Sequence, residues 1–182
     1  MKSRTLTCIT AITLFAALAL PVQLAAQHTR YKLIDIPTLG GDKAYGQGNG
    51  PGTARFLNSA GTVVGSSDTS TPDPNAPNSC GNPDCFVSHA FQWRNGVLTD
   101  LGTLPGGNFS GANAINARGW IAGFSQNSEI DPVTGFQAGH AVLWKDDGIH
   151  DLARWARELR VLETTNNGGV VVGISTIDKD PV

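Results

Sequence analysis

Two histidine–aspartate pairs have residue types and a spacing that chemistry could use. His89 precedes Asp100 by 11 positions, His140 precedes Asp151 by 11 positions, and the two pairs stand 51 positions apart. An imidazole beside a carboxylate can act as a general base in catalysis. Catalysis needs such a pair once, however, whereas a hydrogen bond that recurs at a fixed period is explained more simply as a clamp between neighbouring strands. We therefore predict a structural role for all four residues and no catalytic residue.

The chain has three cysteines, of which Cys80 and Cys85 are close neighbours. Cys8 lies in an amino-terminal segment that we expect to be removed on export, which leaves an even count. An even count in an exported chain favours a disulfide bond between Cys80 and Cys85. A ring this small would pin a loop rather than hold the fold. Two thiols without a neighbouring histidine make an incomplete zinc site, and a reduced pair stays open as the alternative.

Aspartates and tryptophans supply the other candidate ligand groups. Asp68, Asp73, Asp84 and Asp131 offer oxygens of the kind that calcium prefers, but their irregular spacing predicts no metal site. Three of the four tryptophans fall on predicted strands, where packing accounts for them. Trp155 departs from the repeat described below and is the best candidate for contact with a ligand. No cofactor is expected, because the chain has no glycine-rich phosphate loop, zinc-binding helix or nucleophile elbow.

The first 26 residues have the parts of a secretory signal peptide. A short basic start is followed by an uncharged run from Leu6 to Leu20, and small residues stand just before position 27. The run is shorter than the roughly 20 apolar residues that span a bilayer. We therefore predict a signal peptide over 1–26, secretion to the extracellular space or the periplasm, and no membrane span after its removal. The folded part is then 27–182.

Charge and composition narrow the classes of partner and fold. Removal of Lys2 and Arg4 with the signal peptide leaves 11 of the 13 basic residues against 15 acidic ones. An acidic chain disfavours nucleic acid and anionic membranes as partners, because both attract basic patches. The 22 glycines and 10 prolines suit a β protein with many turns better than a helical one.

An internal repeat predicts the strands that must position the candidate residues named above. Three segments share one order of asparagine, glycine and apolar residues: Asn58 to Gly65, Asn116 to Gly123 and Asn166 to Gly173. A period near 50 residues is typical of a stacked or circular array of identical units. We place the repeat units at about 31–87, 88–138 and 139–182.

Each period contains four short apolar runs joined by turn residues. Asn95-Gly96 between two such runs is a strong hairpin signal, because both residues tolerate the positive φ of the tight turn. In one period we predict the strands Ala112 to Asn116, Trp120 to Ser125, Ala138 to Trp144 and Ile149 to Leu152. Four strands per period is the plan of a β-propeller blade, whereas a β-helix would show shorter repeats.

The predicted fold class is all-β, with about three four-stranded antiparallel blade-like repeats in a partial or open β-propeller. Closed propellers need about four blades or more, which is more than this chain supplies. One exception to the β pattern is the segment from Leu152 to Leu162, where good helix formers predict a short helical turn.

The second repeat unit carries a more specific motif. It consists of His89-Ala90-Phe91, Trp93, Asn95-Gly96, Thr99-Asp100-Leu101-Gly102-Thr103-Leu104, Gly106-Gly107, Ser110, Ala112, Ile115-Asn116, Gly119 and Gly123. This motif resembles one unit of the HAF-type probable extracellular repeat family, which is named for its His-Ala-Phe triplet. The likeness is looser elsewhere, and Val142 stands where the triplet has phenylalanine. The resemblance implies a secreted β-propeller-like repeat protein and transfers no catalytic residue.

These patterns favour a secreted, non-catalytic module that binds a glycan, a cell-surface partner or another copy of itself. The connection from Ser67 to Phe86 is the expected place for specificity, because insertions in repeat proteins fall at one face of the array. The alternative is a propeller-type hydrolase or lyase acting on extracellular polysaccharide. Such an enzyme would need two non-repeating carboxylates in one cleft, and nothing in the sequence unites the glutamates at 129, 158 and 163.

Overall fold

The computed structural model describes residues 33–46, 56–78, 80–132, 134–146, 148–152 and 159–175. The predicted signal peptide and Trp155 lie outside these residues. The described part of the chain is all-β and has no helix, which confirms the predicted class. Within those ranges no helix is long and apolar enough to cross a membrane.

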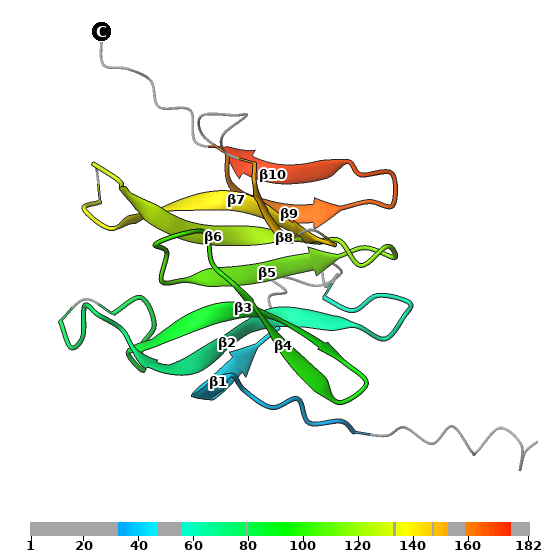
Figure 1. Cartoon of the computed structure of the whole chain (residues 1–182), viewed down its shortest axis with the longest axis horizontal. Helices are drawn as coiled ribbons and strands as arrows, with labels where there is room; N and C mark the ends of the chain where they lie inside the picture. The colour runs from blue at the N-terminus through cyan, green and yellow to red at the C-terminus, as the bar shows by residue number, and fades with distance from the viewer. Residues whose placement is uncertain are drawn as a thin grey trace, which may run out of the picture. The chain divides into compact units, whose positions relative to one another are not determined.

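The strands form three antiparallel sheets (Figure 1). The first sheet contains β1 (Gly40–Tyr45), β2 (Val63–Pro72), β3 (Phe86–Arg94) and β4 (Val97–Gly102). The second sheet contains β5 (Ser110–Ile115), β6 (Ile121–Ile130), β7 (Gln137–Lys145) and β8 (Gly148–Asp151). The third sheet contains β9 (Leu159–Thr165) and β10 (Val171–Ser175). In each sheet the strands lie side by side in chain order.

The four strands predicted between Ala112 and Leu152 are confirmed as the second sheet. The expected count of about three four-stranded units is not confirmed, because the third sheet has two strands within the described residues. The structure shows no closed propeller in that part of the chain. A sequence unit such as 88–138 carries the last two strands of one sheet and the first two of the next, so sheets and sequence units start at different points.

The predicted turns take the backbone conformation that their residues favour. In the hairpin between β3 and β4, φ is 51° at Asn95 and 85° at Gly96, both in the left-handed region. The glycines at 61, 119 and 169, which end the three repeated asparagine turns, also have positive φ, between 74° and 86°.

The helical turn predicted from Leu152 to Leu162 is wrong where the structure describes it. Residues 159–162 begin β9, whose backbone pairs with β10 from Leu159↔Ser175 to Thr165↔Val171. Helix propensity is worth only tenths of a kcal/mol per residue, and pairing with a neighbouring strand overrides it. The rest of the predicted turn, 153–158, lies outside the described residues.

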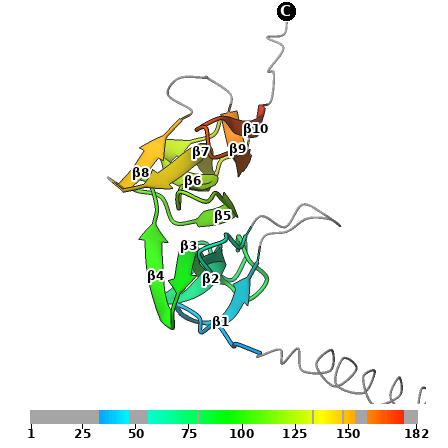
Figure 2. The same cartoon turned by 90° about the vertical axis from the view of Figure 1, so that its right-hand side faces the viewer.

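Apolar side chains between the sheets form the core. The larger cluster joins the first and second sheets and contains Val64, Ala90, Leu104, Ala112, Ile115, Ile121, Val142 and Trp144. Trp144 also donates its indole N–H to the carbonyl of Leu101 on β4, at 3.0 Å. A smaller cluster of Ala122, Ala141 and Leu143 packs against Val171 of the third sheet. Packing therefore connects consecutive sheets, which follow one another in chain order (Figure 2), and the Trp144 hydrogen bond also joins the second sheet to the first.

A ladder of asparagines connects the three sheets at one end. Asn58, Asn116 and Asn166 each accept two backbone N–H groups of their own turn on the side-chain oxygen, at 2.9 to 3.0 Å. The side-chain amide of Asn58 donates to the carbonyl of Asn116 at 3.0 Å, and that of Asn116 donates to the carbonyl of Asn166 at 2.9 Å. We call this series the asparagine ladder. It fixes the turns of successive sheets against one another.

Serine hydroxyls hold the segments that lead into the first and second sheets. Ser67 on β2 accepts the N–H of Leu39 at 2.9 Å, and Ser125 on β6 accepts the N–H of Leu104 at 2.8 Å. Both serines are fully buried. Ser110 accepts the N–H of Ala90 and thereby ties the start of the second sheet to the first. Buried backbone groups that leave one sheet for the next thus keep hydrogen-bond partners.

The asparagine ladder gives a direct stability prediction. In Asn116→Asp the side-chain oxygen that caps the turn remains, but the donor to the Asn166 carbonyl becomes a second acceptor. We expect the free energy of unfolding of the dilute protein in urea to fall by about 1–3 kcal/mol. Asn166→Asp is the matched control, because no described residue accepts from the Asn166 amide within the chain. Equal losses in the two variants would contradict a role for the ladder.

Candidate functional site

The loops opposite the asparagine ladder differ in length between the first and second sheets. The loop after β2 and the loop after β6 leave the sheets at the end away from the ladder turns (Figure 1). Both are closed by the same backbone hydrogen bond, from Asp73 to the carbonyl of Cys85 and from Asp131 to the carbonyl of Phe136. The first loop is longer, as the sequence indicated.

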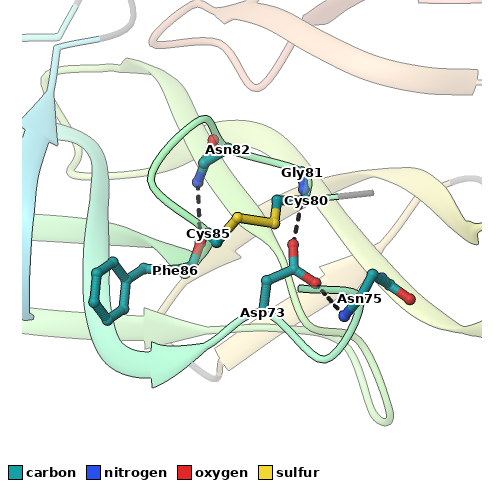
Figure 3. The surroundings of a disulfide bond; sticks show 7 residues. All are labelled: Asp73, Asn75, Cys80, Gly81, Asn82, Cys85 and Phe86. Carbon is teal, nitrogen blue, oxygen red and sulfur yellow. Dashed lines mark hydrogen bonds between the residues drawn. A yellow bond between two sulfur atoms is a disulfide. The ribbon is translucent and has the colours of Figure 1, made fainter. Parts of the chain in front are cut away.

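A buried aspartate and a disulfide bond fix the long loop (Figure 3). One carboxylate oxygen of Asp73 accepts the N–H of Asn75 at 2.8 Å, and the other accepts the N–H of Gly81 at 2.7 Å. The disulfide joins Cys80 to Cys85, with their Cα atoms 5.0 Å apart, and confirms the predicted bond. These contacts set the backbone of the loop.

A groove of about 590 Å³ lies between the long loop and the shorter loop of the second sheet. Its walls are Pro74, Asn75, Cys80, Gly81, Asn108, Phe109, Gln126, Ile130, Gly135, Phe136 and Gln137. None of these lining residues carries a charge. Phe136 is 47% exposed and Ile130 is 60% exposed, so the groove presents an aromatic ring and an aliphatic side chain to solvent.

Close packing on one wall of the groove explains why position 81 is a glycine. A Cβ atom at Gly81 would lie 2.9 Å from the ring of Phe109, which is too short for a carbon–carbon contact. Gln137 holds the opposite wall, because its amide donates to the carbonyl of Gly106 and its oxygen accepts the N–H of Asn108 at 3.2 Å. The groove walls are therefore held by contacts from both sheets.

The histidine–aspartate pairs lie where the repeat predicted them. His89 Nδ1 is 2.9 Å from a carboxylate oxygen of Asp100 on the next strand, and His140 Nδ1 is 2.9 Å from Asp151. Burial raises the pKa of Asp100, but its hydrogen bonds with His89 and with the N–H of Gly102 outweigh this and hold the pKa below the ordinary value of 3.8. Each pair ties the last strand of a sheet to its neighbour.

The second pair has neighbours that the first lacks. The Asn127 amide lies 3.3 Å from His140 Nε2, and a Glu129 oxygen lies 3.8 Å from the same nitrogen. Glu129 and Asp151 both line a second cavity of about 840 Å³, together with Leu104, Pro105, Asn127, Ser128, Ile149, His150 and Leu152. Glu129 has no counterpart in the first sheet, where Thr71 occupies the equivalent position.

The four aspartates weighed as calcium ligands do not meet at one point. Asp73 and Asp131 close the two loops, whereas Asp68 and Asp84 lie together beside Lys43. In the described part of the chain no three His, Cys, Asp or Glu side chains are placed to hold a metal ion.

Asp68 and Asp84 are shifted in opposite directions. Lys43 Nζ lies 3.1 Å from Asp84 and lowers the pKa of that carboxyl. Burial, followed by the neighbouring Asp84, raises the pKa of Asp68, which is fully buried on β2. Ionised Asp68 is therefore costly in the folded protein, because its charge has lost water.

Sequence reasoning placed specificity in the long loop, which supplies one wall of the groove, but did not find the residues of the other wall. Phe109, Phe136, Asn108 and Gln137 come from two other connections, and only the pairing of the sheets brings them opposite the disulfide. The signal available was the loop composition itself, which is rich in amides. Trp155, the predicted ligand contact, lies outside the described residues.

Comparison with protein-family models, curated proteins and solved structures finds no match to this chain. The function proposed below therefore rests on the residues of the chain itself.

Reduction of the disulfide should loosen the long loop and spare the sheets. The ring is small, so we expect the loss of unfolding free energy to stay near or below about 3 kcal/mol. Hydrogen exchange with and without reductant should show faster exchange over 74–85 and little change in β5, β6 and β7. Faster exchange throughout the second sheet would contradict a purely local role. Free thiols at both cysteines of the purified, unreduced protein would contradict the presence of the disulfide.

Asp68→Asn should stabilise the protein at neutral pH. A carboxyl whose pKa is raised on folding contributes stability at low pH that is lost as the pH rises through the folded pKa. The variant removes that charge, so its free energy of unfolding in urea should exceed that of the wild type at pH 7, with the difference vanishing toward pH 3.

Asp100→Asn is the opposite case, because its folded pKa is lowered. The stability from Asp100 is present above pH 3.8 and is lost as the pH falls through the folded pKa, so this variant should be less stable than the wild type at pH 7. A loss of stability at pH 7 in both variants would contradict the assignment for Asp68.

Proposed function

We propose that this protein is a secreted, non-catalytic β-repeat module that binds a neutral glycan in the groove beside the disulfide loop. The proposal includes membership of the His-Ala-Phe repeat family and an arrangement of the sheets as blades of an open β-propeller. The single observation that supports a neutral glycan as the ligand is the chemistry of the groove, which combines uncharged amides with exposed apolar side chains.

These groups are complementary to a sugar. Amide side chains both donate and accept, and therefore match hydroxyl groups, which do the same. An exposed aromatic ring such as Phe136 offers a flat apolar surface for the C–H face of a pyranose. A charged ligand would find no counter-charge among the described lining residues. Neutral hydroxyl-rich molecules thus fit the groove better than peptides of high charge or phosphates.

The groove is also held in place before binding. Asp73 and the disulfide fix one wall, and Gln137 fixes the other. A loop that is already ordered loses little conformational entropy when the ligand binds, which strengthens binding for a given contact area. This gives the disulfide a reason beyond stability, since the sheets are held by their own core.

A glycan array followed by titration calorimetry tests the proposal. We expect binding of a neutral oligosaccharide that falls about tenfold or more in Phe136→Ala, the loss of one stacking contact. Asn108→Ala should weaken binding less, because it removes one hydrogen-bonding group. Val97→Ala, which truncates an exposed apolar residue at the β3–β4 hairpin, is the matched control and should bind normally. Binding that is unaffected by Phe136→Ala would remove the groove as the site.

A second candidate function follows from the larger cavity. Glu129 and Asp151 both approach His140, and two carboxylates in one cleft are the requirement for a polysaccharide hydrolase or lyase. We rank it below binding because Asp151 belongs to the repeated clamp, so only Glu129 is a non-repeating carboxylate in this cavity. Turnover of a polysaccharide that is lost in Glu129→Gln, while Phe136→Ala has no effect, would favour the enzyme.

A further inference from the structure

The first and second sheets bury equivalent residues against the sheet that follows, whereas the third sheet leaves its equivalent residue exposed. The residue six positions after each ladder asparagine is Val64, Ala122 or Val172. Val64 is fully buried in the core between the first and second sheets, and Ala122 is fully buried in the cluster that contains Val171 of the third sheet. Val172 is 54% exposed. The third sheet therefore presents, uncovered, the face on which the other two sheets each carry a neighbour.

On the face of each sheet that is turned toward the preceding sheet, the exposed residue belongs to the first sheet instead of the third. The residue just before each ladder asparagine is Leu57, Ile115 or Thr165. Ile115 is buried in the core shared with the first sheet, and Thr165 is buried in the third sheet, which packs on the second. Leu57 is 56% exposed. The first sheet thus leaves uncovered the face by which the other sheets dock onto a preceding one.

The asparagine ladder ends on the same two faces. The Asn166 amide has no acceptor among the described residues, although the amides of Asn58 and Asn116 each donate to the next turn. The carbonyl of Asn58 accepts only from Gly61 in the described part of the chain, whereas the carbonyls of Asn116 and Asn166 each accept a ladder bond as well. One face therefore has a spare ladder donor and the other a spare ladder acceptor.

We propose that a second copy of this chain docks head to tail, with the third sheet of one copy against the first sheet of the next. Val172 then packs near the partner's Leu57, and the Asn166 amide donates to the carbonyl of the partner's Asn58. The contact repeats the internal contact between consecutive sheets, so its register is set by the same ladder. This inference is separate from glycan binding, because the groove lies at the other end of the sheets.

The partner is a second copy of this chain because each face matches the other face of the same molecule. The two faces are different surfaces, so the contact is heterologous and each copy keeps one free face. Association of this kind continues to a closed ring or an open filament rather than stopping at a symmetric dimer. A symmetric dimer through the third sheet would place the spare ladder donor against another donor, and one through the first sheet would place the spare acceptor against another acceptor.

Two charge variants and their mixture test the geometry. Light scattering coupled to size-exclusion chromatography, from about 10 µM to about 1 mM protein, should show a mass that rises with concentration for the wild type. Leu57→Asp and Val172→Asp each spoil one face, and each alone should remain monomeric. An equimolar mixture still has one intact face of each kind, and should form a species of twice the monomer mass and nothing larger.

Other outcomes contradict the proposal in distinct ways. Association of Leu57→Asp alone would indicate a symmetric contact through the third sheet, and association of Val172→Asp alone a symmetric contact through the first. A wild type that is monomeric at every concentration overturns the proposal. Val97→Asp, at an equally exposed apolar site off both faces, is the control and should associate like the wild type.

A second measurement shows whether the aspartate variants still fold. Far-ultraviolet circular dichroism should be unchanged in both aspartate variants, because each residue replaced is more than half exposed. Asn166→Asp keeps the oxygen that caps its own turn and removes only the spare donor. It should weaken association about fivefold or more without changing the spectrum. Unchanged association in this variant would overturn the extension of the ladder across the contact.

Discussion

The structure depends on the asparagine side chain that begins each repeated turn. Its oxygen accepts two N–H groups of its own turn, and at Asn58 and Asn116 its amide also donates to a carbonyl in the turn of the next sheet. One residue therefore satisfies backbone groups in two sheets at once, in a position where Asn116 is almost fully buried. Aspartate, serine or glycine could each supply part of this chemistry, but none supplies both an acceptor and a donor at that reach.

Other repeated residues follow from the stacking that the ladder fixes. Gly65 on β2 and Gly123 on β6 occupy equivalent places, and a Cβ atom at either would overlap the carbonyl of the first strand, at Tyr45 or Gly111. The buried serines Ser67 and Ser125, two residues further along the same strands, hold the chain segment that enters each of these two sheets. The motif is thus a set of local solutions to one problem, which is how to satisfy backbone groups where a chain leaves one sheet and enters the next.

The features that could be predicted from the sequence are those that depend on the repeat period and on the residue preferences of turns. The positive φ at Asn95 and Gly96, the four strands of the second sheet and the disulfide are all confirmed, because each rests on local residue preferences. The strand at 159–162 was mistaken for helix, because pairing with β10 is invisible in local propensity.

The candidate groove was harder to predict, because its walls also depend on contacts between segments that are distant in the sequence. The long loop was identified from its composition and its cysteines, but Phe109 and Phe136 reach the groove from other connections. Glu129 was named without a neighbour, and only the fold of β6 beside β7 brings it to His140. Contacts between residues distant in the sequence are set by the stacking of sheets, which composition and spacing do not encode.

The shared closing bond of the two unequal loops has a consequence for protein engineering. The pairs Asp73 with Cys85 and Asp131 with Phe136 make the same hydrogen bond at the sheet end, whatever the length of chain between them. Variation in length is therefore absorbed beyond that bond, at the end of the strands away from the asparagine turns. A scaffold built in this way should accept grafted loops of different lengths at successive sheets, each anchored at the same two backbone atoms, and could display them as a row of independent recognition elements.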